Sequence, residues 1–322
     1  MQQNLQQAWL GIDIGSVSGK AAVIDEKGNL LDFVYMKNQG IFETIRKIFD
    51  GLNLDAHKII GCGITGSGRN LVKILINADI AKSEIIAHST ATLFYYPNAR
   101  TIFEIGGEDS KLITVENEIL NNFSMNSVCG GGTGAMIENI ANRMNVKLDD
   151  IGELALKSET ELDLPGKCGI FCTSAVVSKL NAGFRKEDIL MGVCRALIRN
   201  YLTMCAKGKQ LKSDFVFQGA TALNKALVKA LEEEIEHKII VPEHCALMGA
   251  IGIALIAKEN AEKTKFNKNF NIEEFRTLSF KCTDCSNRCE VTQIYKTNLL
   301  IGAVNTRCGK WETKKREIND EI

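Results

Sequence analysis

The segment Ile12–Asp25 reads IDIGSVSGKAAVID, and a second segment, Phe103–Glu116, reads FEIGGEDSKLITVE. The two align without a gap, and an acidic residue, a glycine and a lysine keep the same positions in both. In each, an apolar run leads through a turn of small residues into another apolar run. This pattern predicts a β-hairpin whose tight turn leaves backbone N–H groups free. We therefore expect a duplication, with two related lobes and a cleft between them.

Two such turns that face each other predict a cradle for the phosphates of a nucleotide, with Mg²⁺ held by nearby carboxylates. We expect Asp13 and Asp109 to hold Mg²⁺, directly or through water, and Glu108 to orient or activate the attacking water. The two lysines that follow the turns either touch phosphate or are solvated strand residues. Two unrelated hairpins are the competing interpretation. The turn residues expected at the nucleotide are Gly15, Ser16, Ser18, Lys20, Gly106, Gly107 and Lys111.

A further motif, FQGATALNK at Phe217–Lys225, reads as the end of a strand, a turn of small residues and the start of a helix. The N-terminus of such a helix favours a phosphate group. An ordinary strand-to-helix turn is the alternative. The nucleotide-binding candidates in this motif are Gln218, Gly219, Ala220 and Asn224.

The bulk composition narrows the class of protein. The 322 residues suffice for two domains with real cores, and the net charge of zero argues against nucleic acid as a partner. There is no apolar run long enough for a transmembrane helix, and the polar segment Met1–Gln7 does not resemble a secretory signal. We therefore expect no membrane partner and a cytoplasmic protein. In that compartment, 11 cysteines favour metal binding or redox chemistry over disulfides.

Two cysteine motifs precede predicted helices. Cys129 opens the sequence CGGGTG, and Cys168 and Cys172 lie in KCGIFCT. A helix N-terminus favours the thiolate form, so two helices can point positive ends at one anionic centre. An iron–sulfur cluster needs four thiolates, and a homodimer with two cysteines per subunit supplies them. Buried, inert thiols are the alternative.

The C-terminal region carries a third cysteine motif. Its spacing is typical of a metal site, and it leaves open zinc or a second iron–sulfur cluster. The segment is too short to bury much of a core, so a metal would stabilise it. Free thiols are the alternative interpretation. The four cysteines are Cys282, Cys285, Cys289 and Cys308.

Apolar periodicity predicts strands in both halves with helices around them, and therefore an α/β fold. It predicts three strands within residues 8–36, a helix capped by Ser67, and helices over 173–182 and 220–236. The expected domains are a first lobe at 1–100, against which a closing helix within 244–258 packs, a second lobe at 101–258, a linker at 259–277 and a cysteine-rich tail at 278–322.

With these motifs in place, the chain resembles the ATP-dependent activators of 2-hydroxyacyl-CoA dehydratases, also called archerases. The wider group includes the ATPase subunits of benzoyl-CoA reductase and the reductases of double-cubane-cluster proteins. The resemblance covers about residues 9–258 and rests on the order and spacing of its motifs. They are GIDIGS (11–16), EIGGEDSK (104–111), NSVCGGGTG (126–134), KCGIFC (167–172), FQGATALNK (217–225) and VPEHCALMGAIGIAL (241–255).

The resemblance implies a duplicated acetate-kinase/Hsp70/actin-like, ribonuclease H-like ATPase fold that binds ATP or ADP with Mg²⁺. It implies a homodimer that shares one 4Fe–4S cluster, held by Cys129 and Cys168 of both subunits. An activator of this kind uses ATP to pass electrons at low potential from ferredoxin or flavodoxin to a partner iron–sulfur dehydratase or double-cubane-cluster reductase. Nucleotide-driven movement of the helices beside the cluster would drive the transfer.

Several features depart from the family pattern. Glu104 replaces the usual aspartate and Glu108 replaces the glutamine of many members, which affects metal binding or hydrolysis. Cys172 is an additional thiol, and the compact activators lack the cysteine-rich tail. Two other functions compete with the activator. One is a small-molecule kinase of the same fold, which does not explain the CGGGTG motif. The other is a nucleotide-dependent sensor or scaffold with structural zinc.

Overall fold

The computed structural model of the chain describes residues 5–126, 129–166, 168–260, 263–269, 271–308, 310–311 and 316–317. Contacts between residues divide the chain into two units. Unit 1 comprises Met1–Glu84 and Gly249–Ile322, and unit 2 comprises Ile85–Met248. Residues 85–100, which the sequence assigned to the first lobe, therefore group with unit 2, and the cysteine-rich tail groups with unit 1.

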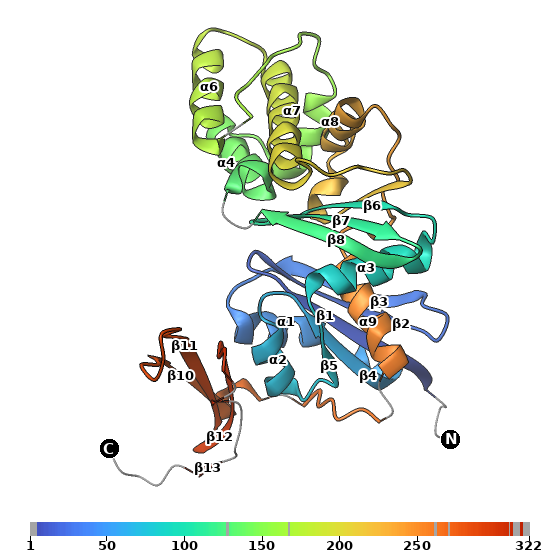
Figure 1. Ribbon diagram of the computed structural model, residues 1–322, viewed down its shortest axis with the longest axis vertical. Helices are drawn as coiled ribbons and strands as arrows, with labels where there is room; N and C mark the ends of the chain where they lie inside the picture. The colour runs from blue at the N-terminus through green and yellow to red at the C-terminus, as the bar shows by residue number, and fades with distance from the viewer. Residues whose placement is uncertain are drawn as a thin grey trace. The chain divides into compact units, whose positions relative to one another are not determined.

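Unit 1 is built on a five-stranded sheet with the order β3-β2-β1-β4-β5 (Figure 1). The strands β1, β2 and β3 are antiparallel neighbours, whereas β4 and β5 continue the sheet in parallel. This confirms the three strands predicted within residues 8–36. The strands are β1 (Gln6–Ile14), β2 (Ser18–Ile24), β3 (Leu30–Lys37), β4 (His57–Thr65) and β5 (Ile80–Ala81).

Helices cover both faces of this sheet because β1 is apolar on both sides. Its residues Leu10 and Ile12 join the core formed with α1 (Ile41–Gly51) and α2 (Arg69–Ile76). On the other face, a Cβ on Gly11 would lie only 2.0 Å from the carbonyl oxygen of Ala250 in α9 (Met248–Asn260). The glycine thus lets α9 lie directly on the strand. A short 3₁₀ turn, η1 (Leu54–Ala56), precedes β4.

Unit 2 contains a four-stranded sheet with the order β8-β7-β6-β9. Its strands are β6 (Thr101–Ile105), β7 (Ser110–Glu116), β8 (Ile119–Asn126) and β9 (Phe215–Gln218). One face carries the large core with the longest helix, α7, and the other face packs against α3 through a smaller cluster around Ile102 and Ile113. The helices and 3₁₀ turns of this unit are α3 (Glu84–Tyr95), η2 (Gly130–Gly132), α4 (Gly134–Met144), η3 (Leu148–Asp150), α5 (Ile151–Ala155), α6 (Gly169–Asn181), α7 (Lys186–Cys205), η4 (Ala220–Leu223) and α8 (Lys225–Ile235).

The duplication seen in the sequence is also present in the topology. In both units two antiparallel neighbours lie on one side of the first strand, and a parallel strand lies on the other. The acid–lysine register is the same, since Asp13 pairs with Lys20 and Glu104 with Lys111 across each hairpin. The structure therefore confirms an α/β fold built from two related halves.

Three local predictions were wrong. Ser67 does not cap α2, because Gly68 is the N-cap residue and the Ser67 hydroxyl donates to the Ile14 carbonyl at 3.3 Å. The helix predicted at 220–236 is broken, since the turn η4 ends before Asn224 caps α8. Helix α6 starts at Gly169 and not at residue 173, so Cys172 lies inside its first turn. A capping pattern depends only on nearby residues. It therefore does not predict where contacts with neighbouring elements decide the end of a helix.

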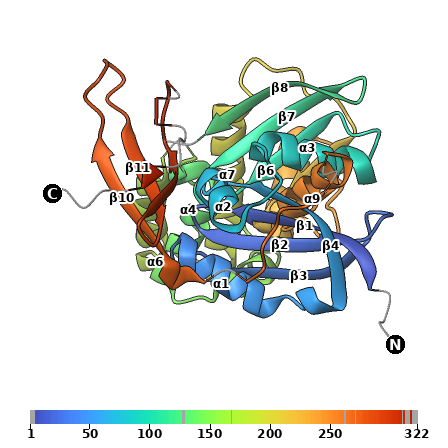
Figure 2. The ribbon, with the colours of Figure 1, turned by 90° about the horizontal axis from the view of Figure 1, so that it is seen from below.

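The C-terminal part of unit 1 forms a second, four-stranded sheet (Figure 2). The sequence predicted a linker up to residue 277 and gave no strands in the tail, yet β10 begins at Phe275. The sheet docks on α2, where a Cβ on Gly302 would lie 2.7 Å from the Cδ1 atom of Ile74. Its elements are η5 (Ile272–Glu274), β10 (Phe275–Lys281), β11 (Glu290–Lys296), β12 (Leu299–Val304) and β13 (Arg316–Glu317).

Within the described ranges, none of the helices combines the length and the apolar character needed to cross a membrane.

Candidate functional site

The turn between β1 and β2 is closed by a hydrogen bond from the Gly15 amide to the Ser18 carbonyl at 3.0 Å. Asn38 holds the turn from the side, since its amide group donates to the Gly15 carbonyl at 2.7 Å. In the described part of the chain, the backbone N–H groups of Ser16 and Val17 donate to no protein acceptor. The free backbone N–H groups predicted for this turn are therefore present.

The acidic residue below this turn is buried. Asp13 is 3% exposed, and its carboxylate pairs with the Lys20 ammonium at 3.1 Å. The lysine bends toward the turn, since its Nζ atom lies 3.9 Å from where a Cβ on Gly15 would be. Ser16 is exposed, whereas Ser18 is buried. A carboxylate and an ammonium below a turn with free N–H groups suit a bound phosphate and its cation.

The turn between β6 and β7 has the same closure, because the Gly106 amide donates to the Asp109 carbonyl at 2.9 Å. Lys111 lies between two carboxylates, 3.0 Å from Glu104 and 2.9 Å from Asp109. Glu104 and Lys111 are both buried, while Asp109 is partly exposed. Glutamate in place of the usual aspartate therefore still keeps the acid–lysine pair.

The two remaining acidic candidates differ in their surroundings. Asp109 is held by Lys111, whereas Glu108 is exposed and forms no hydrogen bond or ion pair with any other described residue of the chain. Among the described residues, the backbone N–H groups of Gly107 and Glu108 also donate to no protein acceptor. Asp109 is therefore oriented in advance, while the Glu108 side chain can rotate toward a ligand.

The FQGATALNK motif lies beside the second hairpin, because β9 pairs with β6 in parallel and sets Gln218 opposite Glu104. Gly219 has φ 94° and packs so closely that a Cβ would lie 2.5 Å from the Ile105 carbonyl oxygen. Gln218 is fully buried, and its Nε2 group has no hydrogen-bond partner in the described part of the chain. Ala220 begins η4, and the Asn224 oxygen caps α8 by accepting from two backbone amides.

Sequence reasoning missed the matching residue in unit 1. Gly66 follows β4, has φ 91°, and would place a Cβ 2.3 Å from the Ile14 carbonyl oxygen and 2.7 Å from the Asp13 carboxylate. Gly219 has the same relation to Ile105 and Glu104. The signal was present in the sequence, since the glycine and small residue of Gly66-Ser67 follow β4 as those of Gly219-Ala220 follow β9. Each buried acid therefore lies between a hairpin turn and a glycine turn.

Cys129 lies at the start of the glycine-rich turn η2. Its Sγ atom accepts a hydrogen bond from the Gly131 amide at 3.4 Å. The Asn126 side chain accepts from the Cys129 amide and donates to the Cys129 carbonyl. The turn rests on α7, because a Cβ on Gly132 would lie 2.9 Å from the Asn200 Oδ1 atom and 3.1 Å from the Tyr201 amide nitrogen. The glycines thus let the loop lie directly on the helix.

The second cysteine motif meets this turn. Cys168 is the N-cap residue of α6, and the backbones touch where a Cβ on Gly131 would lie 3.1 Å from the Gly169 amide nitrogen. Both cysteines are free and half-buried. The next two side chains after Gly169, Ile170 and Phe171, are 77% and 68% exposed. Two accessible thiols at adjoining helix starts can serve as ligands of one anionic centre.

Cys172 differs from these two residues. Its side chain is buried, and burial raises the pKa of its thiol to about 11. A thiol with this pKa stays protonated at neutral pH and is a poor metal ligand. In the tail, Cys282 is buried, Cys289 is half-buried, and Cys285 and Cys308 are exposed. Across the described residues, no three histidine, cysteine or acidic side chains are gathered into a ligand set.

The β6–β7 turn of unit 2 is hydrogen-bonded directly to the end of the cysteine loop. The amides of Gly134 and Ala135, at the start of α4, donate to the carbonyls of Gly106 and Gly107 at 2.8 and 2.7 Å. From the other side, the Tyr201 hydroxyl donates to the Lys111 carbonyl at 2.8 Å. Displacement of the hairpin turn must therefore act on α4 and on the loop that holds Cys129.

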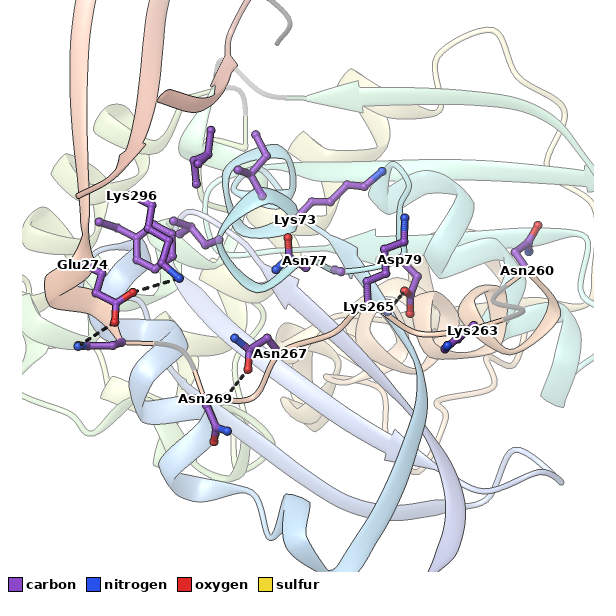
Figure 3. Close-up of a pocket in the computed structure, with 16 residues that line it drawn as sticks. Lys73, Asn77, Asp79, Asn260, Lys263, Lys265, Asn267, Asn269, Glu274 and Lys296 are labelled. Atoms are coloured by element: carbon purple, nitrogen blue, oxygen red, sulfur yellow. Dashed lines mark hydrogen bonds and ion pairs between the residues drawn. The ribbon is translucent and has the colours of Figure 1, made fainter. Parts of the chain in front are cut away.

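A cavity of about 780 Å³ in unit 1 lies away from all of these groups (Figure 3). It is lined by α2 and by the segment that leads into the tail sheet, and none of the predicted nucleotide or cysteine ligands borders it. Polar groups in its wall pair with one another, since Lys296 binds Glu274 at 3.1 Å and the Lys265 amide binds Asp79 at 2.9 Å. We assign no ligand to it.

Comparison with known proteins shows the family of the chain. Residues 10–257 match the BadF/BadG/BcrA/BcrD ATPase family. The chain belongs to this family. Over 258 residues it is 32% identical to the (R)-2-hydroxyglutaryl-CoA dehydratase activating ATPase of Acidaminococcus fermentans, which covers 79% of the chain and 98% of that protein. The family match ends before the tail sheet.

Solved structures of this BadF/BadG/BcrA/BcrD family support the assignment. The structure of component A of the A. fermentans (R)-2-hydroxyglutaryl-CoA dehydratase matches with a TM-score of 0.73 and 30% identity, covering 80% of the chain and all of that protein. The activator of the 2-hydroxyisocaproyl-CoA dehydratase from Clostridium difficile, with bound ADPNP, matches with a TM-score of 0.72 and 29% identity over 79% of the chain and 96% of that protein. The family ATPase therefore carries the predicted actin-like fold.

Proposed function

We propose that this family ATPase is an activator that couples ATP hydrolysis to electron transfer into a partner iron–sulfur dehydratase or double-cubane-cluster reductase. The observation that carries the proposal is the pair of hydrogen bonds from the start of α4 to Gly106 and Gly107. They join a phosphate-binding turn to the loop of Cys129 without any intervening element. The names of the matched relatives, which are activators of dehydratases, support the same role.

The nucleotide part of the proposal rests on the two hairpin turns. Their free N–H groups bind phosphate oxygens, and Asp13 and Asp109 hold Mg²⁺ directly or through water. Glu108 orients the water that converts ATP to ADP and phosphate, because its carboxylate is exposed and free to rotate within the described structure. Lys20 and Lys111 hold the neighbouring carboxylates in place.

The residues of one subunit fit half of a 4Fe–4S site. Cys129 and Cys168 are accessible thiols at adjoining helix starts, and the Gly131 amide already donates a hydrogen bond to the Cys129 sulfur. A cluster takes four thiolates, so a second copy of the chain completes the set in a homodimer. The exposed side chains of Ile170 and Phe171 next to Cys168 supply apolar surface for that contact.

A bound 4Fe–4S cluster supplies a one-electron carrier of low potential. The chain's own part is to hold the thiolates and to change their surroundings when the nucleotide changes. Ferredoxin or flavodoxin is oxidised by one electron, and the partner protein is reduced by the same electron. Loss of the γ-phosphate releases the turn at Gly106, and α4 moves with it through its backbone hydrogen bonds.

The test is the iron and sulfide content of the anaerobically purified chain, measured together with its ATPase activity. We expect about two irons per chain, because one cluster of four irons is shared by two subunits. Cys129→Ala should lose this iron and still bind ATP. The control Cys194→Ala should keep it, because that thiol is buried in α7 and burial raises its pKa to about 12. About two irons per chain in Cys129→Ala would contradict the proposal.

A second variant separates the nucleotide part from the cluster part. Asp13→Ala should lose ATP hydrolysis by about a hundredfold or more, since the carboxylate that positions Mg²⁺ is removed. Its iron content should equal that of the unmodified chain, because Cys129 and Cys168 both lie in unit 2 and Asp13 lies in unit 1. Unchanged hydrolysis in this variant would exclude the Mg²⁺ role.

A further inference from the structure

The tail sheet places its four cysteines at one end. Cys282 follows the last residue of β10 and Cys289 precedes the first residue of β11, and Lys281 pairs with Glu290 across the hairpin. Thr292 of β11 pairs with Val304, the last residue of β12, so the chain leaves β12 at this same end. Cys285 lies in the β10–β11 loop and Cys308 follows β12. Cys282 and Cys308, which are 26 positions apart in the chain, therefore lie in loops at the same end of the sheet.

Two of these cysteines already lie together. The Cys282 amide donates to the Cys289 carbonyl at 2.8 Å, which sets the two residues directly opposite each other. Both belong to a small apolar cluster that also contains Val291, Ala303 and Trp311. Directly opposed residues of antiparallel strands have Cβ atoms about 4.5–5.5 Å apart. Two thiolates at this separation can reach one metal ion through bonds of about 2.3 Å.

The Cys282 sulfur also receives a hydrogen bond from the tail itself. The Trp311 Nε1–H group donates to it at 3.4 Å, and the indole ring packs edge-on against Phe280. Donors of this kind commonly hold and tune the sulfur atoms of metal sites. Lys310 lies next to Trp311 and pairs with Asp284 in the hairpin loop, so the segment after β12 is tied to the loop by a salt bridge.

The tail also needs a stabilising contact at this end. Farther from this end, the sheet is anchored in the core of unit 1 through Phe275 and Ile294, and Gly302 packs on α2. At the cysteine end, the described residues Cys282, Val291 and Ala303 form a small buried cluster. A cluster of this size buries too little apolar surface to order two loops, and small folds of this kind are commonly stabilised by a metal.

We propose that the tail binds one Zn²⁺ ion in a tetrahedral site of four thiolates, from Cys282, Cys285, Cys289 and Cys308. In the described structure these four thiols are not gathered into a ligand set. Cys285 and Cys308 are exposed, whereas Cys282 is buried. Binding therefore draws the two exposed thiols toward the Cys282–Cys289 pair and orders both loops, so folding of this end and metal binding are coupled. In a cubane cluster each thiolate binds a different iron atom, whereas two directly opposed thiols suit a single tetrahedral ion.

The experiment measures zinc, iron and sulfide in the full chain and in Cys285→Ser and Cys308→Ser. We expect about one zinc per chain, and in each variant a zinc affinity reduced by about a hundredfold or more. Both substitutions are at exposed positions, so loss of zinc does not follow from loss of folding. Cys62→Ala is the control, because Cys62 is buried in β4 and its thiol stays protonated.

Two further readouts make the outcome decisive. Co²⁺ added to the reduced chain should give a thiolate-to-cobalt absorption band, which Cys285→Ser and Cys308→Ser should weaken. Trp311→Phe keeps a ring against Phe280 but removes the N–H donor to Cys282, and should lower zinc affinity about tenfold.

Unchanged zinc binding in both serine variants would overturn the proposal. Loss of iron and sulfide instead of zinc would overturn it in favour of a cluster. Cys129→Ala should leave zinc unchanged, so the two proposals fail separately.

Discussion

Each buried acid below a hairpin turn is neutralised by the lysine directly across the hairpin. In unit 2 the pair is almost completely removed from water, with side-chain exposures of 3% for Lys111 and 6% for Glu104. Taking both charges out of water costs several kcal/mol per ion, and their mutual attraction offsets this only while both are present. Removal of either Glu104 or Lys111 should therefore leave the other charge buried without compensation and destabilise the folded state.

Lys111→Met should destabilise unit 2 by about 3–5 kcal/mol, because it leaves the Glu104 carboxylate buried without its cation. Urea unfolding monitored by circular dichroism measures this as a lower transition midpoint. The double variant Lys111→Met with Glu104→Gln should recover part of the loss, since no uncompensated charge then remains. A single variant as stable as the unmodified chain would contradict the cost assigned to the unpaired buried carboxylate.

Lys212→Met is the matched control. Lys212 also pairs with a glutamate of unit 2, Glu116 at 3.0 Å, but both side chains are about half exposed. An exposed ion pair contributes about 0–1 kcal/mol, so this variant should unfold almost like the unmodified chain. The difference between the two lysine variants isolates burial as the cause.

At the scale of elements, the strand that runs parallel to the first strand in the main sheet of each unit is followed by a glycine that lies against the first strand. Gly66 and Gly219 have φ 91° and 94°, and both approach a backbone carbonyl oxygen of the neighbouring strand. Only glycine combines this conformation with that approach. These two positions bring the strand-to-helix turns alongside the buried acids, which is why the turns and the acids form one group in each unit.

Gly219→Ala should lower stability by about 3 kcal/mol or more, because it adds backbone strain of about 1–2 kcal/mol to a contact of 2.5 Å with the Ile105 carbonyl oxygen. It should also weaken ATP binding, since the turn must shift away from Glu104. Thermal unfolding and nucleotide titration measure the two effects. Gly66→Ala should behave in the same way in unit 1.

Gly208→Ala separates strain from contact. Gly208 has φ 73°, and a Cβ there would meet nothing within 4 Å. This control should therefore cost only the strain of about 1–2 kcal/mol and leave nucleotide affinity unchanged. Equal losses in Gly208→Ala and Gly219→Ala would mean that the close approach to the neighbouring strand carries no energetic weight.

At the scale of the whole molecule, apolar side chains are exposed next to the two cysteines. Ile170 and Phe171 lie in the first turn of α6, directly after the Cys168–Gly169 pair, and both are more than two-thirds exposed. The thiols of one chain supply half of the ligands that the proposed cluster needs. Assembly of two chains would therefore cover the apolar surface and complete the ligand set together.

Ile170→Asp should weaken the dimer by about tenfold or more and reduce the iron content in parallel, because a carboxylate replaces an apolar contact beside the ligands. Sedimentation velocity over a concentration series measures the dimer, and iron analysis follows the cluster. Ile119→Asp is the control, since Ile119 is 70% exposed on β8 of the same unit but lies far from Cys168 in sequence. A dimer weakened equally by both variants would contradict this assignment of the interface.

Much of the architecture is predictable from the sequence because the deciding interactions are local. The acid and the lysine of each hairpin are seven positions apart, and a tight turn is sufficient to bring them together across two strands. The α/β class, the duplication, most helices and the acidic and glycine candidates follow from such short-range patterns. The missed tail sheet shows the limit, since its strands alternate weakly and most of β10 is exposed.

By itself, then, the sequence determined the two hairpin turns and the cysteine-bearing loops, because the patterns that predict hairpins and helix starts depend on neighbouring residues. Only the tertiary structure decided that Gly66 lies beside Asp13, that Gly131 touches Gly169, and that Cys172 is buried with a raised thiol pKa. It also decided that α4 is hydrogen-bonded to the turn at Gly106. These relations join residues far apart in the chain, and they depend on the order of the strands and the burial of whole faces, which no local pattern encodes.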